Sequence, residues 1–280
     1  MLTELKRRFM AYAQTLQPDD PAIQAMLQLK IDHTMRVCQE IITLGQQLDL
    51  PAPLLTLAEI TAVFHDVGRF EQFATYRTFA DRLSVDHAAL GVTILRQCGL
   101  LHGIDPALHD VIYRVIAYHN RKAVPLPEND LCLFLTKLLR DADKLDIWHV
   151  VLEEYAKPSA QRNADICMGL PDTPELSAAA CADLLARRMV DIRHLRTLND
   201  FKLLQLGWMY DLNFSATFQA LRERRYIERL RATLPATVVV QNIFATLADY
   251  QQQRAQEAQM KIPVDFPATI FIMESHDSYM

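Results

Sequence analysis

The stretch AEITAVFHDVGRF, residues 58–70, joins an apolar run to a His65-Asp66 doublet directly before Gly68. The apolar spacing predicts a helix over residues 53–66, so the doublet stands at its end. A carboxylate placed among apolar side chains costs several kcal/mol unless a cation compensates its charge. The doublet therefore indicates a place where a positive ion is bound.

Two further side chains in the N-terminal half fall on apolar helical faces in the same way. His33 shares a predicted face with Val37, and Asp143 follows Leu135 and Leu139 at spacings of four residues. Each therefore points toward a core. Imidazole and carboxylate together are a normal ligand set for Zn, Mn, Fe or Ni, so these residues predict a metal site.

The rest of the chain also reads as helix. Seven glycines among 280 residues are too few for the many turns of a β-sandwich or barrel, or for a glycine-rich nucleotide loop. We predict an all-α protein with helices over residues 4–16, 22–48, 53–66, 85–98, 106–120, 130–150, 176–192, 196–211, 214–233 and 236–260. Residues 157–174, rich in Pro, Ser, Asn and Asp, predict a loop or lid. Since composition does not shift along the chain, we expect residues 1–280 to form a single domain.

Charge and cysteine content narrow the function. The formal net charge of −5 argues against a general binder of nucleic acid polymers. Five scattered cysteines, never spaced as C-x-x-C, indicate neither a disulfide framework nor a zinc ribbon. The N-terminus lacks the features of a signal peptide, and no segment is apolar enough for a membrane helix. We therefore expect a cytoplasmic protein without a membrane partner.

The order of these motifs resembles the HD superfamily of metal-dependent phosphohydrolases. The matching stretches are DHTMRV at 32–37, FHDVGRF at 64–70 and RDADKLD at 140–146, and the resemblance covers roughly residues 20–150. It implies an HD-domain helical bundle, extended here by C-terminal helices over about 176–260. It also implies that one divalent metal, of the group Mn, Fe, Ni, Co, Zn or Mg, is bound by His33, His65, Asp66 and Asp143.

Two more histidines lie where binuclear members of the superfamily carry them. These are His87 in SVDHAALG and His119 in AYHNR. Such members include cyclic-dinucleotide phosphodiesterases of the HD-GYP type and di-iron oxygenases similar to myo-inositol oxygenase. The resemblance implies that Asp66 bridges two metals, with His87 and His119 on the second. The stretch AYHNRKAVPLPEND replaces the HD-GYP hallmark, which argues against cyclic di-GMP as substrate. One-ion and two-ion sites both stay open.

A phosphoester substrate also needs cations outside the metal shell. Arg69, one helical turn beyond His65, is the first candidate for a phosphate contact, and Asp66 is the candidate that orients the attacking water. Lys144 adjoins Asp143, and Arg121 and Lys122 follow His119, so these three are further substrate-binding candidates. We expect the pocket to be shaped by loops over residues 69–84 and 121–130. The aromatic residues Phe70, Phe73, Tyr76 and Phe79 are open to base stacking or to ordinary core packing.

The predicted function is hydrolysis of a small phosphoester, with nucleotides among the candidate substrates, at a site of one or two ions. A di-iron oxygenase uses the same ligand order and is the first alternative. A non-catalytic metal-containing sensor is the second. The expected partners are a small phosphorylated substrate and, as an assembly, a homodimer.

Overall fold

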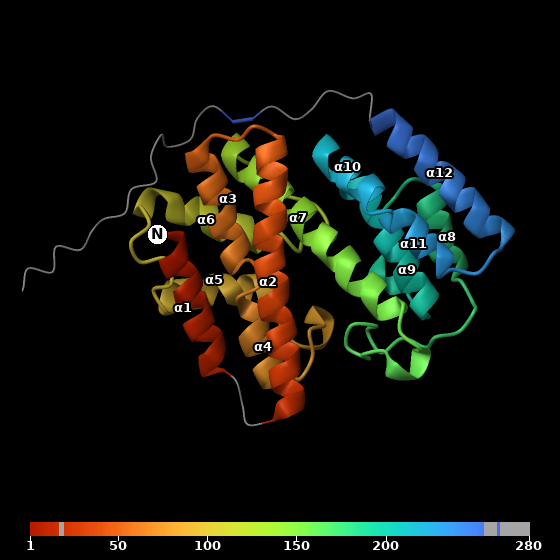
Figure 1. Ribbon diagram of the computed structural model, residues 1–280, viewed down its shortest axis with the longest axis horizontal. Helices are drawn as coiled ribbons and strands as arrows, with labels where there is room; N and C mark the ends of the chain where they lie inside the picture. Colours follow the sequence, from red (N-terminus) through yellow and green to blue (C-terminus); the bar gives the residue numbers. More distant parts are fainter. Residues whose placement is uncertain (17–19, 255–261, 264–280) are drawn as a thin grey trace, which may run out of the picture. The chain divides into compact units, whose positions relative to one another are not determined.

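A computed structural model describes residues 1–16, 20–254 and 262–263 (Figure 1). Every regular element in these residues is a helix, which confirms the all-α prediction. No helix in this part of the chain is long and apolar enough to cross a membrane. The chain divides into two compact units, and the boundary in the sequence falls between Asp143 and Lys144. The second unit spans Lys144–Met260, and that all 280 residues form one domain stays a prediction.

The first unit contains the predicted metal ligands. Its elements are α1 (Leu2–Thr15), α2 (Pro21–Gln47), α3 (Ala52–Phe64), α4 (Gly68–Tyr76), the short 3₁₀ helix η1 (Asp81–Leu83), α5 (His87–Gln97), α6 (Pro106–Tyr118) and the first part of α7 (Asp130–Tyr155). Helix α2 packs along α3, α4 packs against α5, and α5 packs against α6 (Figure 1). These packed pairs bring helix ends from distant parts of the sequence together.

Capping side chains begin several of these helices. Asp20, Asp86 and Asp105 each accept a hydrogen bond from a backbone N–H in the first turn of α2, α5 and α6. A side-chain oxygen at this position satisfies a donor that has no partner inside the helix. In α2 and α6 a proline follows the cap, where its fixed φ suits the first turn. The starts of α5 and α6 are thus defined by local sequence.

The second unit is also helical. After the remainder of α7 come η2 (Ser159–Gln161), α8 (Ala178–Leu185), η3 (Ile192–His194), α9 (Leu198–Gly207), η4 (Trp208–Asp211), α10 (Ser215–Glu223), α11 (Tyr226–Ala232) and α12 (Val238–Arg254). A capping box between Thr197 and Asp200 begins α9. Helix α8 packs against both α9 and α12. These helices correspond to the predicted C-terminal extension, of which residues 255–260 lie outside the described part of the chain.

Three predicted elements differ from the structure. Residues 68–76, expected within a loop, form α4, whose Phe70 and Phe73 are buried. The predicted helix over 214–233 is broken at Arg225, which adopts a left-handed φ of 55° between α10 and α11. The predicted helix over 176–192 is helical only over Ala178–Leu185. Residues 157–174 form a loop with one 3₁₀ turn, as expected.

Candidate metal centre

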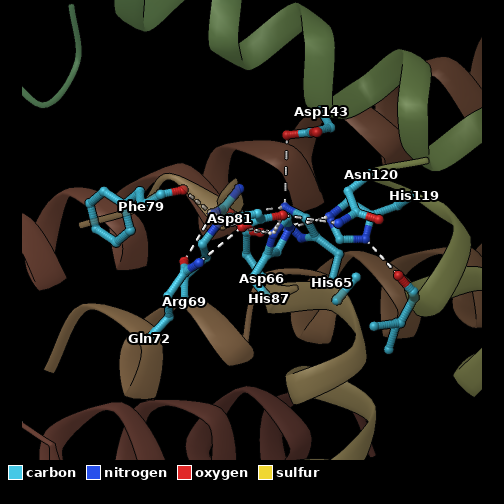
Figure 2. A network of polar contacts seen from close by, with 12 residues as sticks. His65, Asp66, Arg69, Gln72, Phe79, Asp81, His87, His119, Asn120 and Asp143 are labelled. Carbon is cyan, nitrogen blue, oxygen red and sulfur yellow. Dashed lines mark hydrogen bonds and ion pairs between the residues drawn. The ribbon is translucent and has the colours of Figure 1, made fainter. Parts of the chain in front are cut away.

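Six predicted ligands converge in the first unit from five segments of the chain. His33 lies within α2, His65 ends α3, Asp66 follows it, His87 is the first residue of α5, His119 ends α6 and Asp143 lies within α7. All but Asp143 are buried, and the Asp143 side chain is 18% exposed. Figure 2 shows the side chains gathered around Asp66, with Asp143 reaching them from the helix above.

His33, His65 and Asp143 form the first group of donor atoms. The Nε2 atoms of His33 and His65 lie 3.3 Å apart. The Asp143 Oδ1 atom lies 3.2 Å from His33 Nε2 and 3.8 Å from His65 Nε2. Three donors at this separation can share one metal ion.

Asp66, His87 and His119 form the second group. The Nε2 atoms of the two histidines lie 3.1 Å apart. The Asp66 Oδ1 atom lies 3.3 Å from His87 Nε2 and 3.7 Å from His119 Nε2. These are the residues that the family resemblance implies for a second metal: Asp66 of the His-Asp doublet and the two histidines between the doublet and Asp143.

Asp66 connects the two groups because its two oxygens face different sides. Oδ1 faces His87 and His119, whereas Oδ2 lies 3.6 Å from His33 Nε2 and 3.8 Å from His65 Nε2. A carboxylate in this position can give one oxygen to each of two ions. The arrangement therefore has the donors for two metal positions bridged by Asp66.

Hydrogen bonds to the outer ring nitrogens show that a cation fits this donor set. The Nδ1 atoms of His65 and His119 donate to the carbonyls of Ala62 (2.7 Å) and Ile116 (2.6 Å), because a carbonyl oxygen can only accept. His87 Nδ1 lies 2.7 Å from the Asp81 carboxylate. With Nδ1 used in this way, Nε2 of each ring faces inward, and it is the nitrogen left to bind a metal. A divalent ion between these nitrogens turns a repulsive contact into coordination.

This geometry agrees with the family comparison, in which residues 31–148 match the HD domain family. The chain contains an HD domain. HD domains are mostly metal-dependent hydrolases, and the clustered His and Asp residues are consistent with their metal site. No curated protein and no solved structure matches the chain significantly.

Burial and charge set the protonation of the HD-domain ligands. Burial lowers the pKa of His65 to about 4, and burial together with the positive charge of Arg69 lowers the pKa of His87 to about 4. Burial opposes ionisation of Asp66, but Lys30 and His65 hold the pKa of that carboxyl well below its usual value. Burial likewise opposes ionisation of Asp143, and its hydrogen bond with His33 outweighs burial and lowers its pKa. At neutral pH His65 and His87 are therefore neutral, and Asp66 and Asp143 are ionised.

Asp81 contacts a ligand candidate, His87, from outside the donor groups, and the sequence did not reveal this role. Its carboxylate accepts from His87 Nδ1, from Arg69 Nη1 and from Gln72 Nε2, the last two at 2.9 Å, and from Asn120 Nδ2 at 3.2 Å (Figure 2). Asp81 thereby links η1 to α4, α5 and the end of α6. Its position six residues before His87 carries no sequence signal, because η1 has to fold back before the two side chains meet.

Lys30 is the other residue that sequence reasoning missed. It lies one turn before His33 in α2, and its Nζ atom is 2.8 Å from Asp66 Oδ2. Its ammonium also lies 5.3 Å from the centre of the Phe79 ring. The available signal was its i,i+3 spacing to His33, which places both side chains on one face of the helix.

Arg140 supports the His119 end of the centre. The buried guanidinium donates to the carbonyls of His119 (3.0 Å) and Arg121 at the end of α6. A cation at a helix C-terminus satisfies carbonyls that have no partner inside the helix. Arg140 lies one turn before Asp143 in α7. It therefore connects the helix that carries Asp143 to the end of α6, where His119 lies.

The doublet lies close to His87 because two glycines allow the backbones of α4 and α5 to touch. A Cβ atom built on Gly68 would lie 2.1 Å from the His87 carbonyl oxygen and 2.7 Å from the backbone nitrogen of Gly91. No side chain fits at that distance. The glycine in HDVG is therefore a steric requirement for holding His65 and Asp66 beside His87.

The predicted substrate-binding residues have different surroundings. Arg69 is half-buried, with its Nε atom 3.5 Å from Asp66 Oδ1. Arg121 and Lys122 are exposed at the end of α6, and the Arg121 guanidinium lies over the Tyr118 ring. Lys144 belongs to the second unit, where it forms a 2.7 Å ion pair with Asp211. Arg69 thus contacts a metal-ligand candidate directly.

The aromatic residues after the doublet divide between core and site. Phe70 is fully buried and packs edge-on against Phe9. Phe73 is buried and stacks on Phe79 with ring centres 4.4 Å apart. Tyr76 is 46% exposed. Phe70 and Phe73 are thus core residues, and Phe79 is the member of the run that lies beside Lys30.

Proposed function

We propose that the HD domain of this chain is a metal-dependent phosphohydrolase that cleaves a small phosphoester with metal-activated water. The observation that carries this proposal is the environment of Asp66. One of its oxygens faces each donor group, and two cations, Lys30 and Arg69, lie within 3.5 Å of it. Metal ions and fixed cations around one point are what an anionic phosphoryl group requires.

The proposed centre takes one or two divalent ions of the group Mn, Fe, Ni, Co, Zn or Mg. When bound, such ions activate water as a nucleophile and neutralise the charge of the phosphoryl oxygens. His33, His65 and Asp143 would hold one ion, His87 and His119 the other, and Asp66 both. Asp66 is also the residue we assign to orient the attacking water, because its two oxygens face both donor groups.

Positive charge around the centre supports a phosphorylated substrate rather than a neutral one. Arg69 is held near Asp66, and Arg121, Lys122 and Lys144 stay candidates for substrate contacts. We propose a small molecule, with nucleotides among the candidates, rather than a nucleic acid polymer, because the formal net charge of the chain is −5. A cytoplasmic location, the absence of a membrane partner and a homodimeric assembly belong to the same proposal.

A di-iron oxygenase is the second candidate, because two bridged groups of nitrogen and oxygen donors also suit two irons. The two functions differ in what they consume. A phosphohydrolase releases inorganic phosphate under anaerobic conditions, whereas an oxygenase takes up O₂ only when loaded with iron.

The test begins with the full chain stripped of metal and reloaded separately with Mn, Zn or Fe(II). Phosphate release is measured over a panel of phosphomonoesters and nucleotides, and oxygen uptake is measured on the iron-loaded sample. Asp66→Ala is expected to lose both turnover and bound metal. Asp32→Asn is the matched control, since Asp32 precedes His33 but is exposed and accepts a hydrogen bond from Gln28. Oxygen uptake without phosphate release from any substrate would refute the hydrolase proposal.

A further inference from the structure

Two cations lie beside Asp66, but they differ in what else they contact. Lys30 carries three N–H donors, and within the described residues its hydrogen-bond partner is Asp66 Oδ2 at 2.8 Å. Its side chain is 18% exposed, so it is partly buried but still accessible to solvent. Two of its three donors therefore have no protein partner within the described residues.

The side chain of Lys30 is also held in place by a cation–π contact with an aromatic ring. Its ammonium lies 5.3 Å from the Phe79 ring centre, and that ring stacks in turn on buried Phe73. A cation over an aromatic ring is attracted by the ring's negative face. Lys30 is thus positioned before any substrate arrives, which lowers the entropic cost of using it to bind one.

The Nη1 end of Arg69 is already bonded to acceptors in the protein. Its Nη1 atom donates to Gln72 Oε1 (2.9 Å), to the carbonyl of Phe79 and to Asp81 Oδ1 (2.9 Å). Its Nε atom has no hydrogen-bond partner within the described residues, but it is buried against Asp66 at 3.5 Å. The guanidinium therefore joins α4 to the segment that carries Phe79 and Asp81.

We propose that Lys30 binds a phosphoryl oxygen of the substrate, and that Arg69 holds the Phe79–Asp81 segment rather than the phosphate. This inference rests on the proposed phosphohydrolase function and names a substrate-binding residue for it. Divalent ions bound by Asp66 would neutralise the carboxylate with which Lys30 pairs, and the ammonium would then be able to bind a second anion. A compact ammonium with free donors suits a single phosphate oxygen.

Binding of inorganic phosphate to the Mn-loaded full chain tests the assignment by calorimetry, with metal content measured on the same samples. Lys30→Met is expected to bind phosphate about ten- to a hundredfold more weakly than the wild type, while its metal content is unchanged. Lys30→Arg, which keeps the charge, is expected to restore most of the affinity. Lys30→Gln replaces Lys30→Met if the latter does not fold, and the same loss is expected.

Lys6→Met is the matched control, because Lys6 is also a partly exposed lysine that pairs with a buried carboxylate, Glu59, at 2.7 Å. It is expected to bind phosphate as the wild type does. Phosphate affinity of Lys30→Met or Lys30→Gln within about twofold of the wild type would overturn the assignment, as would a metal-loaded wild type that binds no phosphate.

The two proposals fail in different ways. A wild type that binds phosphate through Lys30 but hydrolyses no phosphoester refutes the proposed function and leaves the binding role of Lys30 intact. A wild type that hydrolyses phosphoesters, with a Lys30→Met variant equal to it in both turnover and phosphate affinity, refutes the role of Lys30 alone.

Discussion

The Nε2 atoms of His87 and His119 lie 3.1 Å apart and face each other across the second donor group. The Nδ1 atom of each ring already donates, to Asp81 in one case and to the Ile116 carbonyl in the other. Two inward nitrogens at this distance define a place for a cation. This pair is the strongest local indication in the HD domain that the second donor group binds metal.

Removing one of these histidines should separate the two metal positions. In His119→Ala the first group of His33, His65 and Asp143 stays complete, so we expect the metal content to fall from about two ions per chain to about one. In His33→Ala the second group stays complete and the same number is expected. Metal analysis of anaerobically purified protein measures both. A wild type that holds a single ion, unchanged in His119→Ala, would contradict the two-ion arrangement.

Asp81 should matter to metal affinity although it is not placed among the ligands. Asp81→Asn weakens the acceptor of the His87 Nδ1 proton, so we expect affinity for the second ion to fall about ten- to a hundredfold. The first ion should be retained, because none of its three donors contacts Asp81. Competitive titration with a chelator resolves the two affinities. Equal losses at both positions would show instead that Asp81 supports the fold as a whole.

Substitution of Gly68 should be far more damaging than that of its neighbour Gly91. A Cβ on Gly68 meets backbone at 2.1 Å, whereas a Cβ on Gly91 meets the Val67 side chain at 3.3 Å. We expect Gly68→Ala to lower the free energy of unfolding by about 3 kcal/mol or more, and Gly91→Ala by about 1 kcal/mol. Urea denaturation of both variants measures the difference. Similar losses in the two variants would contradict the close backbone contact.

The metal-free protein should lose stability as the pH falls from 6.5 toward 4. His65 and His87 have pKa values of about 4 when folded and an ordinary value of 6.5 when unfolded. In that window the unfolded chain binds more protons than the folded one, so acid favours unfolding by up to about 2.7 kcal/mol per pH unit for the two groups. Urea melts at pH 7 and pH 5 with a chelator present measure this. Equal stability at the two values would show that both histidines titrate normally in the fold.

The sequence predicted the donors of the centre better than their surroundings. His33, His65, Asp66, His87, His119 and Asp143 all mark helix faces or helix ends, and periodicity shows these directly. Lys30 and Asp81 were not predicted because their roles depend on contacts with residues 36 and 6 positions away, respectively. Only the packed structure brings those side chains together.

The errors in the predicted elements have local causes. Helix α4 begins with Gly68 and carries several aromatic residues, a composition that favours a loop by propensity, and burial of Phe70 and Phe73 overrides it. The break between α10 and α11 occurs at Arg225 in a left-handed conformation that arginine rarely adopts. No residue type in that segment marks the break.

The contact between Gly68 and the backbone of α5 also limits how this centre could be transferred by protein design. Grafting the six ligand side chains onto another helical scaffold would reproduce their identities but not the near-touching of two main chains. A scaffold with helices at the usual separation of about 8–10 Å would hold Asp66 too far from His87. The smallest unit that could be transferred to another protein is therefore the pair α4 and α5 with Gly68 and Gly91, rather than the ligands alone.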